Sequence, residues 1–123
     1  MNADQRLRLT KMVLRLFVLW GIYSREVQGM LLGLPQEELS TICDLNHGRP
    51  LPDRQDVMER VGHLLAIHKL LRTLFPQQRS LAYAWMTTPN AAFAESLPIT
   101  LVRGGGTYGL VCLRNYLELQ TQV

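Results

Sequence analysis

The chain has 123 residues, of which 47% are hydrophobic, and it carries a formal charge of +3 at pH 7. This composition excludes an intrinsically disordered chain and provides for one compact core, or for a small head packed on a larger body. The basic residues are spread along the chain rather than gathered in one strong patch, so the charge is only weak evidence for a nucleic-acid partner.

Cysteine usage and hydropathy indicate where the protein acts. Cys43 and Cys112 form neither a disulfide framework nor a C-x-x-C pair, so we expect both to be reduced. No apolar run approaches the roughly 20 residues that a membrane span needs. Arg15 interrupts the apolar stretch from Met12 to Trp20, and no small-residue cleavage site follows, which argues against a secretion signal. The sequence therefore predicts a cytoplasmic protein without a membrane partner.

The first predicted element is an amphipathic helix over residues 6–20, because apolar side chains recur there at helical spacing and Gly21 ends the pattern. Leu14, Val18 and Leu19 make the apolar stripe wider than one core contact requires. Deep burial within the domain explains that width, and a dimer contact is the alternative.

Two short helices are predicted next. Ser24 is a good N-cap for the first, and Gly33 lies in the turn that ends it. Pro35 suits the first position of the second helix, which is expected to run to about Asp44. This spacing is typical of a helix-turn-helix, although a helical hairpin that only completes the core or an interface is an equally good interpretation.

DNA binding by this motif is a weaker prediction than its shape. The second helix carries Glu37, Glu38 and Asp44, and these three negatively charged carboxylates would be repelled by the DNA phosphates. Side chains able to contact bases or phosphates are nevertheless present nearby. The candidate DNA-binding residues are Arg25, Gln36, Ser40, Thr41 and Arg49.

The stretch 46–52 combines Asn, Gly and two prolines and is the clearest break in the chain. It divides the sequence into a helical head, residues 1–50, and a helical body, residues 51–123. Asp53 is expected to cap a long helix that ends at Phe75 before a proline. His68 lies within its apolar stripe, and its five-residue spacing from His63 does not suit a metal site, so we interpret His68 as a hydrogen-bonded core residue.

The last third of the chain holds three further helices. The first, residues 77–87, is expected to turn Leu81, Ala82 and Trp85 inward before a rigid Thr-Pro-Asn exit. Phe93 is the one large apolar residue of the following linker and is expected to pack into the core of the helical body. Pro98 opens a short helix that a run of three glycines ends, and no Gly-Lys-Ser/Thr accompanies those glycines as a phosphate loop would require.

The terminal helix, from Thr107 to about Leu119, has two apolar rows instead of one. Leu110, Leu113 and Leu117 form the first row, and one row suffices for packing on the domain. The second row lies on the opposite side, so it is either buried too or free for a partner, since Tyr is enriched at interfaces. Its members are Tyr108, Cys112, Tyr116 and Leu119.

The order of these features resembles the toxin-binding domain of the Xre/MbcA/ParS antitoxins. The resemblance covers roughly residues 56–119 and rests on an arrangement rather than on a catalytic motif. The N-terminal half resembles the helix-turn-helix head of that family more loosely. The features that carry the resemblance are Ile67-His68, Phe75-Pro76, Trp85 to Asn90, Phe93, Pro98, Leu101-Val102, the glycines, Gly109-Leu110 and Tyr116-Leu117.

The resemblance implies an all-α antitoxin of a type II toxin-antitoxin system. In that family the C-terminal domain binds the toxin, the toxin is commonly a RES-domain protein that consumes NAD, and the head can bind operator DNA for transcriptional autoregulation. Family members act as dimers or larger complexes, so a homo-oligomer is expected. For this chain the implied mechanism is steric, with the body docking near the toxin's active-site cleft. The expected toxin contacts are Gly104, Gly105, Gly106, Tyr108, Cys112, Tyr116 and Leu119.

The alternative function is a DNA-binding autorepressor that acts through the head. An enzyme is the weakest interpretation, because the sequence lacks a nucleophile with its base, an H-E-x-x-H pair, a Walker loop and a dinucleotide fingerprint. We therefore expect no catalytic residues, no cofactor and no metal.

Overall fold

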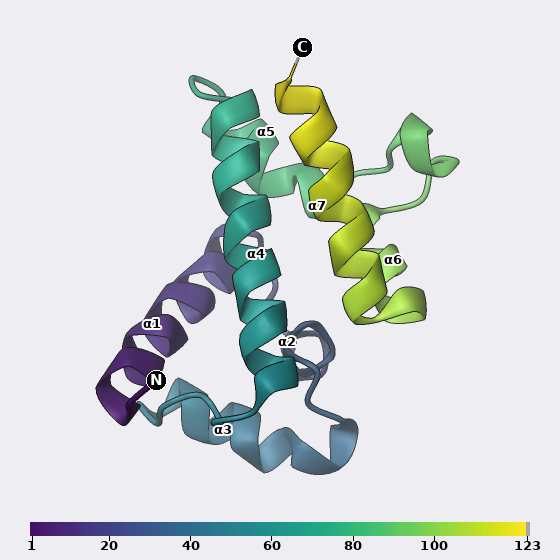
Figure 1. The fold of residues 1–123 in the computed structure, drawn as a ribbon. Coiled ribbons are helices and arrows are strands. Elements are labelled where there is room, and N and C mark those ends of the chain that lie inside the picture. Colours follow the sequence, from purple (N-terminus) through teal and green to yellow (C-terminus); the bar gives the residue numbers. More distant parts are fainter. Residues whose placement is uncertain (123) are drawn as a thin grey trace.

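The computed structural model describes residues 1–122 and is all-α, as predicted (Figure 1). Val123, the last residue of the expected body, lies outside the described residues. Short 3-10 helices precede α3 and follow α5. In chain order the elements are α1 (Ala3–Leu19), α2 (Arg25–Leu32), η1 (Gln36–Glu38), α3 (Leu39–Asn46), α4 (Gln55–Leu74), α5 (Arg79–Ala84), η2 (Trp85–Thr87), η3 (Ala91–Phe93), α6 (Pro98–Gly105) and α7 (Thr107–Thr121).

The long helix α4 is the centre of the fold, with α1 along one side and α7 along the other (Figure 1). Its 20 residues place apolar side chains toward both neighbours, and α2 and α5 pack against it as well. The buried side chains form one hydrophobic cluster that draws on residues before and after position 50. On α4 the buried members are Val57, Val61, Leu64, Ile67 and Leu71.

The first helix begins earlier than predicted, at Ala3, because Asn2 and Gln5 form a capping box that satisfies free backbone N–H groups at its start. Its inward residues are buried as expected. The prediction that the whole apolar stripe is deeply buried is wrong, however, because Val18 is 51% exposed and Met12 is 52% exposed. Both keep about half of their surface in solvent, because a single helix packed on one neighbour cannot bury more than part of its circumference.

The two short head helices are present, but the second begins later than predicted. Ser24 caps α2 by accepting a hydrogen bond from the Val27 N–H, and Gly33 ends α2 in the left-handed conformation at φ +76°. Pro35 starts the 3-10 turn η1 rather than an α-helix, and α3 begins only at Leu39. The α-helical part of this hairpin therefore starts one turn beyond the proline.

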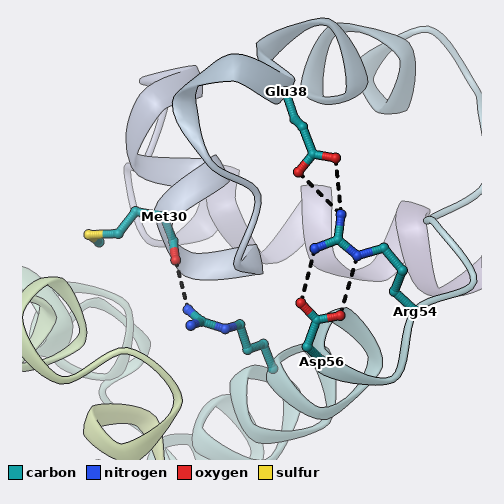
Figure 2. A network of polar contacts seen from close by, with 5 residues as sticks. Met30, Glu38, Arg54 and Asp56 are labelled. Atoms are coloured by element: carbon teal, nitrogen blue, oxygen red, sulfur yellow. Dashed lines mark hydrogen bonds and ion pairs between the residues drawn. The ribbon is translucent and has the colours of Figure 1, made fainter.

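An arginine bridge fixes the start of α4 against η1. Arg54 donates to both carboxylate oxygens of Glu38, at 3.0 and 3.2 Å, and to Asp56 at 3.0 and 3.3 Å (Figure 2). The hydrogen bonds from Arg54 hold the pKa of Asp56 below its ordinary value. Asp53, the predicted cap, is exposed and lies 3.8 Å from Arg6 instead, so that prediction is wrong. The backbone at Arg54 is extended and the helix starts at Gln55.

Two predictions for the body are also wrong in detail. Leu81 is 49% exposed, because α5 is only six residues long and then tightens into η2, which leaves Ala82 and Met86 as the buried residues. His68 stacks on Tyr83, with ring centroids 6.2 Å apart, and its buried Nδ1 has no hydrogen-bond partner among the described residues. Its packing is aromatic rather than polar.

Candidate functional site

The glycine run forms a tight turn between α6 and α7. Gly104 and Gly105 are exposed and belong to the last turn of α6, so the helix ends two residues later than predicted. Gly106 alone separates the two helices and has a φ of +59°, a conformation that residues with a side chain rarely adopt. Its N–H donates to the Val102 carbonyl at 2.8 Å and closes α6.

Past the turn, α7 folds back closely onto α6 (Figure 1). Gly109 permits this approach, since a Cβ there would lie 2.7 Å from the carbonyl carbon of Leu101 and 3.0 Å from the Cα of Val102. Those distances are shorter than any ordinary carbon contact. The backbones of α6 and α7 therefore touch at Gly109, which fixes the turn relative to the rest of α7.

The first apolar row of α7 is buried as predicted: Leu110, Leu113 and Leu117 are each at most 1% exposed. The second row is neither wholly core nor wholly free. Tyr108 is 74% exposed at the start of the helix and Leu119 is 62% exposed near its end. The two residues between them, Cys112 and Tyr116, are half-buried.

Tyr116 is covered by an aromatic cluster built from the preceding linker. It stacks on Trp85, with centroids 6.3 Å apart and planes 21° apart, and meets the edge of Phe93 at 5.0 Å. Trp85 and Phe93 also pack edge to face at 6.1 Å. Such aromatic pairs stabilise a fold beyond the area they bury. The middle of the second row thus helps to attach the linker to α7, and its two ends remain accessible.

Side chains of α7 shift the pKa values of Tyr108 and of His63 on α4. A hydrogen bond with Cys112 raises the pKa of the Tyr108 phenol above its ordinary value. Farther along, Arg114 contacts Glu118 at 3.0 Å and the His63 Nδ1 at 3.3 Å. Burial, together with the positive charge of Arg114, lowers the pKa of His63.

Sequence reasoning missed Arg60, which reaches the turn from α4. Its Nη1 donates to the Met30 carbonyl at 3.0 Å (Figure 2). A Cβ on Gly33 would lie 2.6 Å from its Nε, and a Cβ on Gly106 would lie 3.1 Å from its Nη2. The available signal was a cation placed between Val57 and Leu64, two apolar residues that lie one helical turn before and after it.

The candidate DNA-binding residues lie on or beside the α2–α3 hairpin. Gln36, Ser40 and Arg49 are exposed, whereas Thr41 is half-buried. Arg25 contacts the sulfur of Cys43 and so connects the start of α2 to α3. Four of the five candidates are therefore exposed to solvent, and Arg25 among them also contacts Cys43.

Two kinds of site are absent from residues 1–122. No group of three or more His, Cys, Asp or Glu side chains is placed to hold a metal ion. None of the helices in this range is both long and apolar enough to cross a membrane.

Residues 70–118 match the family model for the antitoxin Xre/MbcA/ParS C-terminal toxin-binding domain. The match runs from the end of α4 through most of α7 and includes the glycine turn, Tyr108, Cys112 and Tyr116, while Leu119 lies one residue beyond it. No curated protein and no solved structure matches the chain at a significant level. The resemblance predicted from the sequence is confirmed for this segment, which is similar to the toxin-binding domain of these antitoxins, while residues 56–69 lie outside the match.

Proposed function

From the antitoxin domain at residues 70–118, we propose that the chain neutralises a cognate toxin in the cytoplasm by steric occlusion, without catalysis of its own. The observation that carries the proposal is the exposure of the two ends of the second row of α7, Tyr108 and Leu119, next to a fixed glycine turn. We name the expected contact region the α7 face. It consists of Gly104, Gly105, Gly106, Tyr108, Cys112, Tyr116 and Leu119.

Exposure supports this face as a binding surface. Tyr108 and Leu119 are two of the most exposed large apolar side chains in the described residues, and both lie within or beside the matched domain. Large aromatic residues in a rigid setting supply contact area at little entropic cost, and α7 is anchored along its other side. The backbone closure at Gly109 provides that rigidity.

Co-expression with the product of the adjacent gene tests the proposal. We expect the two chains to co-purify, and we expect Tyr108→Ala to weaken the complex roughly tenfold or more, as for an interface aromatic. Tyr23→Ala is the matched control, because Tyr23 is 70% exposed but lies in the head. Equal loss in both variants, or no complex with the unaltered chain, would refute this assignment.

The proposed toxin class is a RES-domain protein that consumes NAD, as the resemblance implies. Its activity is measured as loss of NAD when purified toxin is mixed with increasing amounts of the chain. We expect inhibition at a one-to-one ratio, and we expect Leu119→Ala to need more protein for the same effect. A partner that forms the complex but leaves NAD intact would contradict the RES assignment and would keep the antitoxin assignment.

The alternative is an autorepressor that binds operator DNA through the head. One observation favours it: the Arg54 bridge neutralises Glu38, one of the three carboxylates expected to repel phosphates. Binding to the chain's own promoter should then weaken as salt rises, and Arg49→Ala should reduce the slope of that dependence. Salt-independent or absent binding would leave the head without this role.

We propose in addition that the chain forms a homo-oligomer. The apolar side chains that α1 leaves exposed, Met12 and Val18, support an additional contact on that helix. Light scattering after size-exclusion chromatography should give a mass above the 14.0 kDa of one chain. Val18→Lys should reduce that mass, and a monomer at all concentrations would contradict the proposal.

A further inference from the structure

Arg60 lies at the point where the head and the glycine turn meet. Its guanidinium passes between Gly33, the left-handed cap of α2, and Gly106, the residue between α6 and α7. A side chain at either glycine would come within 3.1 Å of the arginine or closer. Two positive-φ glycines from distant parts of the sequence thus leave room for one cation.

Most donors of this guanidinium are unused within the chain. Nη1 bonds to the Met30 carbonyl, and the buried Nε has no hydrogen-bond partner among the described residues. In residues 1–122 the arginines that form ion pairs with carboxylates are Arg6, Arg54 and Arg114. Arg60 is thus a partly buried cation without a carboxylate, and such a cation is costly unless it acquires one.

Arg60 also lines an open groove of about 280 Å³. Arg103, from the last turn of α6, is the second cation on its wall, and the remaining wall is apolar or backbone. Glu26 lines the adjoining hollow with Arg103, but its carboxylate does not pair with either arginine within 4.0 Å. The groove therefore combines two unpaired positive charges with a shape that admits one side chain.

We propose that this groove binds a carboxylate side chain, Asp or Glu, of the toxin, an inference that rests on the proposed function. A planar carboxylate can accept two parallel hydrogen bonds from a guanidinium, and such charged bonds are stronger than neutral ones. The groove shares Gly106 with the α7 face, so a partner that covers Tyr108 reaches Arg60 across the turn. Glu26 nearby disfavours a doubly charged phosphate relative to a singly charged carboxylate.

The first test uses the chain alone. The Arg60 Nε–H signal is followed by NMR during titration with N-acetylglutamate α-methylamide, whose only charge is the side-chain carboxylate. N-acetylglutamine α-methylamide is the uncharged isostere, and inorganic phosphate is the second anion. We expect a saturable shift with the glutamate compound only. Equal shifts with the amide, a larger shift with phosphate, or no shift at Arg60 would overturn the proposal.

The second test uses the complex with the adjacent gene product. Arg60→Met should weaken binding roughly tenfold to a hundredfold, because it removes charged hydrogen bonds, and Arg60→Lys should restore only part of the loss. Arg103→Met should weaken binding less. Arg79→Met, which removes an exposed cation at the start of α5, is the control and should bind normally.

The outcomes separate this inference from the proposed function. If the unaltered chain binds no toxin, the proposed function fails, and the titration of the chain alone still decides whether the groove accepts a carboxylate. If the unaltered chain binds and the Arg60→Met and Arg103→Met variants bind equally tightly, the carboxylate site is refuted and the antitoxin role stands. Should Arg60→Met fail to fold, Arg103→Met and the titration decide.

Discussion

Replacement of Gly109 by Ala should destabilise the protein, although alanine is the better helix former. A Cβ at Gly109 would meet backbone atoms, at 2.7 Å from the Leu101 carbonyl carbon and 3.0 Å from the Val102 Cα. Backbone cannot swing aside as a long side chain does, so α6 and α7 must move apart by roughly 1 Å to restore ordinary contact distances of about 3.5–4 Å. The cost therefore falls on the whole packing of α6 against α7.

The magnitude follows from two opposing effects. Overpacking a tight contact costs about 1–3 kcal/mol, and we expect about 3 kcal/mol here because the obstruction is backbone. Alanine recovers about 1 kcal/mol of helix propensity, which leaves a net loss of about 2 kcal/mol. At about 4 °C per kcal/mol for a chain of this size, Tm should fall by about 8 °C.

Gly62→Ala is the matched control, since Gly62 also lies inside a helix but a Cβ there would meet nothing within 4 Å. It should raise the free energy of unfolding by about 0.5–1 kcal/mol. Urea unfolding and thermal melts of both variants measure the contrast. If Gly109→Ala is as stable as Gly62→Ala, the close approach of α6 and α7 described above is wrong.

Four further substitutions test other parts of the structure. Tyr116→Ala should cost about 1–3 kcal/mol in urea unfolding because it removes the aromatic cluster, whereas Leu119→Ala should stay within about 0.5 kcal/mol of the unaltered chain; equal effects would show that the two residues share one environment. Gly33→Ala should cost about 1–2 kcal/mol for the left-handed backbone and should shift the NMR signals of Arg60, and an unchanged spectrum would refute the contact. Burial, with a smaller contribution from Arg72, lowers the pKa of His68, so the unfolded chain takes up the proton first as pH falls below about 6.5. Stability should therefore decrease from pH 6.5 downward until the lowered pKa is reached, and His68→Phe should reduce that slope; an identical slope would exclude His68 as its source.

The spacing of apolar residues, together with the capping residues, glycines and prolines at helix ends, predicted most of the helices, because these are local properties of the chain. The Leu110, Leu113 and Leu117 row is buried, Ser24 caps α2, and Pro98 opens α6 as expected. The errors lie where a distant residue decides the local outcome. Arg54 replaces Asp53 at the start of α4 because its guanidinium is held by Glu38, sixteen residues earlier, and no local pattern contains that pairing.

The candidate site shows the same limit. The glycine turn and the second row of α7 could be located from residue order, but their exposure could not, since Tyr116 is covered by residues of the linker before α6. The place of Arg60 beside the turn could not be predicted, because it depends on two glycines, at 33 and 106, that are 73 residues apart in the chain. Helix periodicity predicts which residues share a face of a helix, whereas the packed fold determines which other side chains cover that face.

The central position of α4 has a consequence for how this domain can be inherited. The matched segment starts at residue 70 and so retains only the last few residues of α4, yet α7 packs along the helix that begins at Gln55. A recombination event that transferred residues 70–118 alone would deliver α7 without the surface that buries its leucines. The smallest segment that another gene could acquire intact must start no later than Gln55, so the unit of sequence similarity is shorter than the unit that can be exchanged.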